Sequence, residues 1–506
     1  MTLTLRLAAA VGLVLAPLMA QPALAQAELR IALQDEPDTL DPATNWSFVG
    51  RIVLQSMCDK LVDVDAEGTI VPMLATAWTW SADGKVLTFR LRDKVTFHDG
   101  TPFDAEAVMY NLDRALTLKE SRRRSEIDVI AGMEVIDPLT LAISLKQPSV
   151  PLLAALSDRA GMMVSPKAGR ELGAELTRKP VCAGPYRFVE NKPQDRIVFE
   201  KFPQHWRAGD YAYDRLIFKG LPDSSVRLLN LRAGQFDIID RLAPTDVGQV
   251  EKDASLAVHK ATGLGYYNIT FNIGNGTGAN PAIAQNKLVR QAIDLAIDRK
   301  AINDVAFEGR FVAANQPFAT GSTYFDPSRP VPARDVAAAK AKLKQAGLSD
   351  LTFSMLVPTD PQRQQVAQIL QAMLAEAGIT LKVVSNELMS LLDAGRQGKF
   401  EAHLIGWSGR VDPDLNVTPL LSCKAAGNDG RYCNPALDEL LAQARATADV
   451  AARKALYAKV TATILDDAPV IYLYDPVWIF ATTAKLKGFK AFPDGIIRLE
   501  GVTPVR

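Results

Sequence analysis

Between residues 351 and 407 the chain alternates between two kinds of apolar pattern, and this alternation leaves few folds open to it. Three short apolar runs are typical of strands: LTFSMLV (351–357), ITLKVVS (379–385) and FEAHLIGW (400–407). The segment after the second run is helix-like through Leu391 and Leu392. The segment after the first ends at Gly378 and has one apolar helical face, formed by Val366, Ile369, Leu370, Met373, Leu374 and Ala377. Such alternation predicts an α/β layer with parallel strands.

The turn GWSGRVDPD (406–414) follows the third run directly, so it emerges at the carboxyl end of a predicted strand. In open α/β sheets, ligands bind at that edge. The turn brings together an aromatic ring, a hydroxyl, a guanidinium and carboxylates. We therefore take it as a candidate ligand site, with Trp407, Ser408, Arg410 and Asp412 as its candidate residues.

A glycine-bearing stretch, ATGLGYYNITFNIGNG (261–276), separates this α/β layer from the first half of the chain. Its composition suits a crossing between domains, so it is a candidate hinge. Its glycines do not match a phosphate-cradling pattern, and nucleotide binding is not expected. In the first half, WTWSADGKVLTFRLRD (78–93) predicts a hairpin with its turn at Asp83-Gly84, and Asp104 is a predicted N-cap for the helix that follows.

The first 25 residues combine the cation Arg6, an apolar run and the small residues Ala23 and Ala25. This pattern is typical of a cleaved secretory signal peptide, and the apolar run is shorter than the roughly 20 residues that span a bilayer. We therefore expect a soluble protein in a bacterial periplasm. The 57 Lys and Arg residues balance the 57 Asp and Glu residues, so the charge does not favour a nucleic-acid partner.

Four cysteines in an exported chain allow three disulfide pairings. Cys423 and Cys433 flank the turn-rich stretch KAAGNDGRY, which a bridge can close, and this leaves Cys58 with Cys182. The alternative is a metal site. Because no CxxC motif or histidine cluster accompanies the cysteines, two structural disulfides are favoured.

No set of catalytic residues is evident. The four histidines, His98, His205, His259 and His403, show no HExxH spacing, and the chain has no GxSxG motif. The acidic pairs at 412/414 and 466/467 are typical of turns, although a hydrolase that uses carboxylates alone stays open. We expect no enzyme and no cofactor.

Several segments together resemble a known family. They are the stretch from Val71 to Leu116, CAGPYRFVE (182–190), RLLNLRAGQFDII (227–239), YYNITFNI (266–273) followed by NKLVRQAIDLAIDRKAI (286–302), and GWSGRVDPD. In that order they resemble the solute-binding proteins of peptide-type ABC importers. This family includes periplasmic dipeptide-, oligopeptide-, nickel- and glutathione-binding proteins, and the resemblance runs over nearly the whole mature chain.

The resemblance implies a two-lobed periplasmic binding protein of the large, type II peptide-binding class, with a ligand enclosed between the lobes. Lobe one would comprise 26–55, 181–261 and 475–506, with an extra subdomain at 56–180, and lobe two would comprise 262–474. The protein would act as a monomer and would deliver its solute to ABC permease subunits in the inner membrane. Closure would depend on the ligand's preference for the closed form.

Arg410 departs from the pattern of the peptide-binding members, in which an aspartate three residues after the tryptophan pairs with the α-ammonium of the peptide. A guanidinium repels an ammonium and suits a carboxylate. Three alternatives follow: Asp412 has taken over the ammonium, or the ligand presents an acidic group to Arg410, or Arg410 forms a structural pair with Asp412 or Asp414.

The resemblance also implies contacts from two further segments. The loop TNWSF would line the cleft through Thr44, Asn45 and Trp46. Of Tyr266 and Tyr267, one would point to the core and the other to the cleft. The expected ligand is a short peptide or peptide-like solute. The alternative is an acidic non-peptide solute such as an opine-like compound or an organic acid, with nickel or a secreted hydrolase less favoured.

Overall fold

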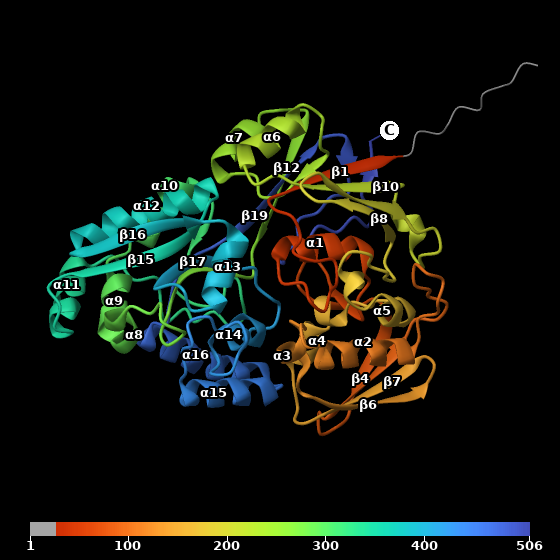
Figure 1. The fold of residues 1–506 in the computed structure, drawn as a ribbon, viewed down its shortest axis with the longest axis horizontal. Helices are drawn as coiled ribbons and strands as arrows, with labels where there is room; N and C mark the ends of the chain where they lie inside the picture. Colours follow the sequence, from red (N-terminus) through yellow and green to blue (C-terminus); the bar gives the residue numbers. More distant parts are fainter. Residues whose placement is uncertain (1–26, 506) are drawn as a thin grey trace, which may run out of the picture.

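The computed structural model describes residues 27–505, so the predicted signal peptide at 1–25 lies outside the described residues. Figure 1 shows two α/β bodies, each with a sheet at its centre, and a further layer of strands below the body that contains the N-terminal strand. Within residues 27–505, no helix combines the length and the apolar character needed to cross a bilayer.

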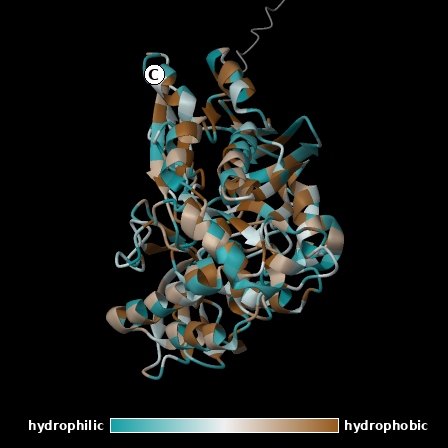
Figure 2. Cartoon of the chain, turned by 90° about the vertical axis from the view of Figure 1, so that its left-hand side faces the viewer, coloured by the Kyte–Doolittle hydropathy of each residue, from teal (hydrophilic) through white to brown (hydrophobic). Residues whose placement is uncertain are grey.

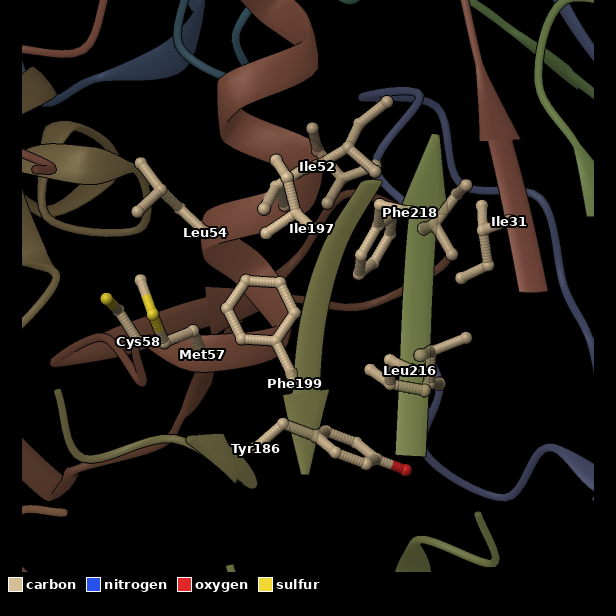
Figure 3. Close-up of a cluster of buried hydrophobic side chains, with 14 of the residues drawn as sticks. Ile31, Ile52, Leu54, Met57, Cys58, Tyr186, Ile197, Phe199, Leu216 and Phe218 are labelled. Atoms are coloured by element: carbon tan, nitrogen blue, oxygen red, sulfur yellow. The ribbon is translucent and has the colours of Figure 1, made fainter. Parts of the chain in front are cut away.

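The first sheet has seven strands in the order β12-β19-β11-β1-β10-β9-β8, with β1 parallel to its neighbours β10 and β11. The strands are β1 (Glu28–Leu33), β8 (Tyr186–Lys192), β9 (Arg196–Lys201), β10 (Arg215–Gly220), β11 (Ile238–Ile239), β12 (Leu256–Thr262) and β19 (Val477–Thr483). Helix α1 (Phe48–Met57) packs Ile52 and Met57 against Phe199 and Phe218 of this sheet (Figure 3). Helices α6 (Ser224–Arg232) and α7 (Val247–Val250) join Ala32 and Ile239 in a second cluster.

The second sheet contains the predicted α/β layer. Its order is β14-β18-β13-β17-β15-β16, and β15 runs parallel to both β16 and β17. The strands are β13 (Tyr266–Phe271), β14 (Val312–Ala313), β15 (Leu351–Pro358), β16 (Ile379–Asn386), β17 (Ala402–Trp407) and β18 (Val470–Asp475). Helices α12 (Pro361–Glu376) and α13 (Leu388–Arg396) connect the three parallel strands. The α/β prediction is therefore confirmed for this layer.

Helices cover both faces of the second sheet. One face shares a core with α9 (Lys287–Leu295), α10 (Arg299–Phe307), α11 (Val336–Gln345) and α12. The other packs on α14 (Asp414–Leu421), α15 (Pro435–Ala446) and α16 (Val450–Asp467), and the short α8 (Pro281–Gln285) precedes α9. Figure 2 shows hydrophobic and hydrophilic residues interspersed along the helices, as expected for elements with one buried face.

A four-stranded antiparallel sheet, in the order β4-β5-β7-β6, makes up the further layer of strands. Its elements are β4 (Ala75–Trp80), β5 (Val86–Leu91), β6 (Ile130–Asp137), β7 (Thr140–Leu145) and the covering helix α2 (Ala105–Thr117). The predicted hairpin corresponds to β4 and β5, and Asp104 caps α2 by accepting from the Ala107 N–H. Three short helices and a strand pair lie nearby: α3 (Arg124–Ile127), α4 (Pro151–Ala155), α5 (Pro166–Leu172), and β2 (Val62–Val64) with β3 (Ile70–Pro72). Near the C-terminus, β20 (Leu486–Lys487) pairs with β21 (Thr503–Pro504).

The chain crosses between the two large sheets twice, and the two crossings run side by side. β12 leads into β13 through Gly263 and Gly265, and β18 leads into β19 through Pro476. The Gly263 N–H donates to the Pro476 carbonyl at 2.9 Å. A Cβ at Gly265 would lie 1.8 Å from the Trp407 carbonyl oxygen, so only glycine fits where the crossing meets the turn after β17. This pairing suits the predicted hinge, and the division into lobes at 262 and 475 stays a prediction.

Two disulfides are present, between Cys58 and Cys182 and between Cys423 and Cys433. The first joins the end of α1 to the segment before β8 and is fully buried. The second closes the loop between α14 and α15, at the surface of the second body.

Candidate functional site

A cavity of about 210 Å³ is lined by residues of both large bodies. The first body contributes the segment after β1 and the start of α1, including Asp35 and Arg51, and the second contributes β13, β17 and the turn after β17. Both β1 and β17 reach the cavity with their carboxyl ends. This is the edge at which ligands bind in open α/β sheets.

Six of the nine predicted ligand-binding residues line this cavity. They are Trp46, Tyr266, Tyr267, Trp407, Ser408 and Arg410. The cavity therefore brings together residues that are distant in sequence. They come from the loop before α1, from β13 and from the turn after β17.

The other three predicted residues lie outside the lining. Asn45 is fully buried, and its Oδ1 accepts from Arg159 at 2.7 Å. Both carboxylate oxygens of Asp412 accept from Arg453, at 2.7 and 2.8 Å, so Asp412 is not open to an ammonium. Thr44 is half-buried in the loop before α1. In place of the predicted contacts, Asn45 and Asp412 hold arginine side chains in position.

The two tyrosines of β13 both reach the cavity, and they do so differently. Tyr266 packs in the core beside α14 and donates its hydroxyl to the Asn416 carbonyl at 2.8 Å. The Tyr267 ring stacks on Tyr474, and its hydroxyl accepts from Arg241 of the first body at 3.2 Å. Tyr267 thus forms one direct polar link between the bodies.

Asn416, on the first turn of α14, fixes the shape of the turn after β17. Its Oδ1 accepts from Trp407 Nε1 at 3.0 Å and from the Arg410 N–H at 2.7 Å, and its amide donates to the Arg410 carbonyl at 2.9 Å. The Arg410 guanidinium lies 4.8 Å from the centre of the Trp407 ring. The turn therefore presents its arginine and its aromatic ring together.

Arg410 pairs with a residue of the first half of the chain. Its Nε lies 2.6 Å from Asp158 Oδ2, while Asp158 Oδ1 accepts from Arg51 Nε at 3.0 Å. Arg51 and Arg410 each also donate to Ser408 Oγ at 3.1 Å. The structural pair of Arg410 is thus Asp158, and neither Asp412 nor Asp414. These contacts join the two bodies at the cavity.

Two more arginines belong to this group, which we call the arginine cluster: Arg51, Arg123, Arg159 and Arg410. Its carboxylates are Asp158 and Glu126, the latter 2.6 Å from Arg123. Burial, and then repulsion from Arg51, lowers the pKa of Arg410 to about 10; burial and repulsion from Arg123 likewise lower the pKa of Arg159. Four guanidinium groups thus face two carboxylates, and this end of the cavity carries excess positive charge.

Sequence reasoning missed Arg51, Arg123, Arg159 and Asp158. The run SRRRSE (121–126) and the adjacent pair at 158 and 159 were the only local signals, and charged runs usually belong to solvated surfaces. Among residues 27–505, no group of three or more His, Cys, Asp or Glu side chains could hold a metal ion.

Comparison with known proteins agrees with this architecture. Residues 69–429 match the model of bacterial extracellular solute-binding proteins, family 5 middle region. The glutathione-binding protein GsiB of Pectobacterium atrosepticum is 30% identical over 519 residues, which cover 99% of this chain and 98% of that protein.

Solved structures show the same two-lobed fold. The periplasmic binding protein DppA of Helicobacter pylori, in complex with the peptide STSA, superposes with a TM-score of 0.87 at 27% identity over 95% of this chain and 99% of that one. The binding protein AgaA of A. tumefaciens R10, in complex with agropinic acid, gives a TM-score of 0.84 at 26% identity over 94% and 98% of the two chains. The chain therefore belongs to family 5 of the bacterial extracellular solute-binding proteins.

Proposed function

We propose that this protein is the periplasmic receptor of an ABC importer and that it captures a short peptide or peptide-like solute rich in carboxylates. The solute would be enclosed between the lobes and delivered, without chemical change, to permease subunits in the inner membrane. Relatives that are named for glutathione, peptides and agropinic acid support a solute of this general kind. The two lobes would be 262–474 and the remainder of the mature chain, with 56–180 as the extra subdomain of lobe one and the protein acting as a monomer.

The arginine cluster is the observation that carries this proposal. Arg51 and Arg410 each use Nε for Asp158 and Nη1 for Ser408, and within residues 27–505 neither Nη2 has a hydrogen-bond partner. Both residues line the cavity. Two guanidinium groups held side by side, each with an open N–H group, suit a carboxylate of the solute.

The same cluster supports a second candidate, an acidic solute that is not a peptide. The complex of AgaA with agropinic acid favours this candidate, because that relative binds an acidic non-peptide compound. Binding of agropinic acid in preference to glutathione and dipeptides would identify this second class.

Replacing Arg410 by glutamine should weaken the binding of carboxylate-bearing solutes about tenfold or more, because a charge-assisted hydrogen bond to the solute is lost. Calorimetric titration with glutathione, the dipeptide Met-Leu and agropinic acid measures this. Glutathione and Met-Leu with a C-terminal amide each lack one carboxylate. These amides should bind the wild type more weakly than the corresponding acids.

The matched control is Arg90→Gln on the exposed side of β5, which should leave every affinity unchanged. If Arg410→Gln binds the acids as tightly as the wild type does, or if acids and amides bind the wild type equally, the cluster is not a carboxylate site. Equal binding of acids and amides would contradict the proposed solute class.

A further inference from the structure

Besides the arginine cluster, the cavity is lined by residues of β13, β17, α13, α14 and the loop 423–433, and we call this part of the cavity the β17 branch. Its walls are apolar and comprise Leu388, Met389, Leu392, Ile405, Leu420 and Leu421. Its polar side chains decide what the branch can hold, and they include Asn268, Thr270, His403, Asn428, Asp429 and Tyr432.

Asp429 is the carboxylate of the β17 branch, and it lacks a close partner. Its side chain is 18% exposed, and neither carboxylate oxygen accepts a hydrogen bond from any residue in the range 27–505. The Nε2 atom of His403 lies 3.9 Å from Asp429 Oδ2, beyond hydrogen-bond reach, and burial lowers the pKa of His403 to about 4, so its ring is neutral. Burial raises the pKa of Asp429 to about 6 and outweighs the attraction of Arg396 and Arg431, so the carboxylate is only partly compensated.

His403 lies beneath this carboxylate on β17. It is 2% exposed, and neither ring nitrogen has a hydrogen-bond partner among the described residues. Its ring packs against Phe400 with centroids 4.7 Å apart. Buried polar groups are usually paired, so an unpartnered imidazole beside an unpartnered carboxylate indicates a site that is completed by something else.

The protein's own cations near Asp429 are occupied or exposed. Arg396, at the end of α13, pairs with Asp393, and Arg431 is exposed in the same loop as Asp429. The loop itself is held in place: Cys423–Cys433 closes it, and the Asn275 amide donates to the Asp429 carbonyl at 2.9 Å. The backbone of Asp429 is thus held in place, while its carboxylate has no hydrogen-bond donor among the described residues.

We propose that Asp429, supported by His403, is a second binding subsite, which takes a nitrogen donor of the solute such as a free amine. This inference rests on the proposed function and extends it. The solute's carboxylate would lie at the arginine cluster and its amine in the β17 branch. The receptor would then select solutes that carry both groups, because each end of the cavity repels the charge that the other end binds.

The test compares solutes that differ only at the amine. Glutathione and Met-Leu are each titrated beside their N-acetyl forms, which keep every carboxylate and lose the ammonium. The wild type should prefer the free amine about tenfold or more, since a charge-assisted hydrogen bond is lost on acetylation. Asp429→Asn should abolish most of that preference and leave the preference for acids over C-terminal amides unchanged.

Two further sets of variants make the outcome decisive. Asp304→Asn, which removes an exposed carboxylate of α10 outside the cavity lining, should retain the amine preference. His403→Gln keeps a hydrogen-bond donor and an acceptor, so it should retain more of the amine preference than His403→Leu. If His403 served only to fill space, the two variants would not differ in this way.

Equal binding of amine and N-acetyl forms by the wild type, or an amine preference that survives in Asp429→Asn, would overturn the subsite while leaving the proposed function standing. If none of these solutes binds in any form, both the subsite and the proposed function fail.

Discussion

Removing the Cys58–Cys182 disulfide by a double substitution to alanine should lower the free energy of unfolding by about 5 kcal/mol, the largest stability loss that we expect from any change described here. The two cysteines are 124 residues apart, and the loss of loop-closure entropy in the unfolded chain grows with that separation. They also stand where the chain enters and leaves the predicted subdomain 56–180. The bridge therefore holds both ends of that segment at one point beside α1.

The Cys423–Cys433 bridge is the matched control, because it closes a loop with a separation of only 10 residues. Its removal should cost about 3 kcal/mol on the same basis. Urea unfolding of the two double variants, under identical conditions, measures the difference of about 2 kcal/mol. An equal loss for the two bridges would show that the entropy of the unfolded chain does not govern their contribution.

The parts of the fold that depend on local pattern were predictable from the sequence. The strands β15, β16 and β17 and the helices between them follow from apolar periodicity, and Asp104 caps α2 because capping involves only residues close in sequence. Position at the carboxyl end of a strand was enough to place Trp407, Ser408 and Arg410 in the cavity.

The partners of the charged residues were not predictable in the same way. One of the three alternatives paired Arg410 with a carboxylate of its own turn, yet Asp412 binds Arg453 on α16 and Arg410 binds Asp158 of the other body. That alternative treated neighbours in sequence as neighbours in space. In a turn that is buried between two bodies, the side chains instead meet whatever the long-range packing brings near.

Asp158→Asn is expected to lower the free energy of unfolding by about 3 kcal/mol or more, because it removes one partner of a buried ion-pair network and leaves the cations uncompensated. Asp158 is 5% exposed and contacts Arg51 and Arg410 together. Burial alone would raise its pKa, but the guanidinium groups of Arg410 and Arg51 outweigh burial and hold the pKa well below its usual range. The stabilisation is thus present above the ordinary aspartate pKa and is lost as the pH falls through the lower pKa of the folded protein.

Because Asp158 and Arg410 belong to different bodies, the substitution should also favour a more open arrangement of the two. Small-angle scattering of the ligand-free protein would show this as a larger radius of gyration, and urea unfolding would give the stability loss. Asp304→Asn, which breaks the exposed pair with Lys300, is the control and should change neither quantity appreciably. If Asp158→Asn unfolds at the same urea concentration as the wild type, Asp158 does not compensate the charge of the arginine cluster. Its role in holding the bodies together is then excluded.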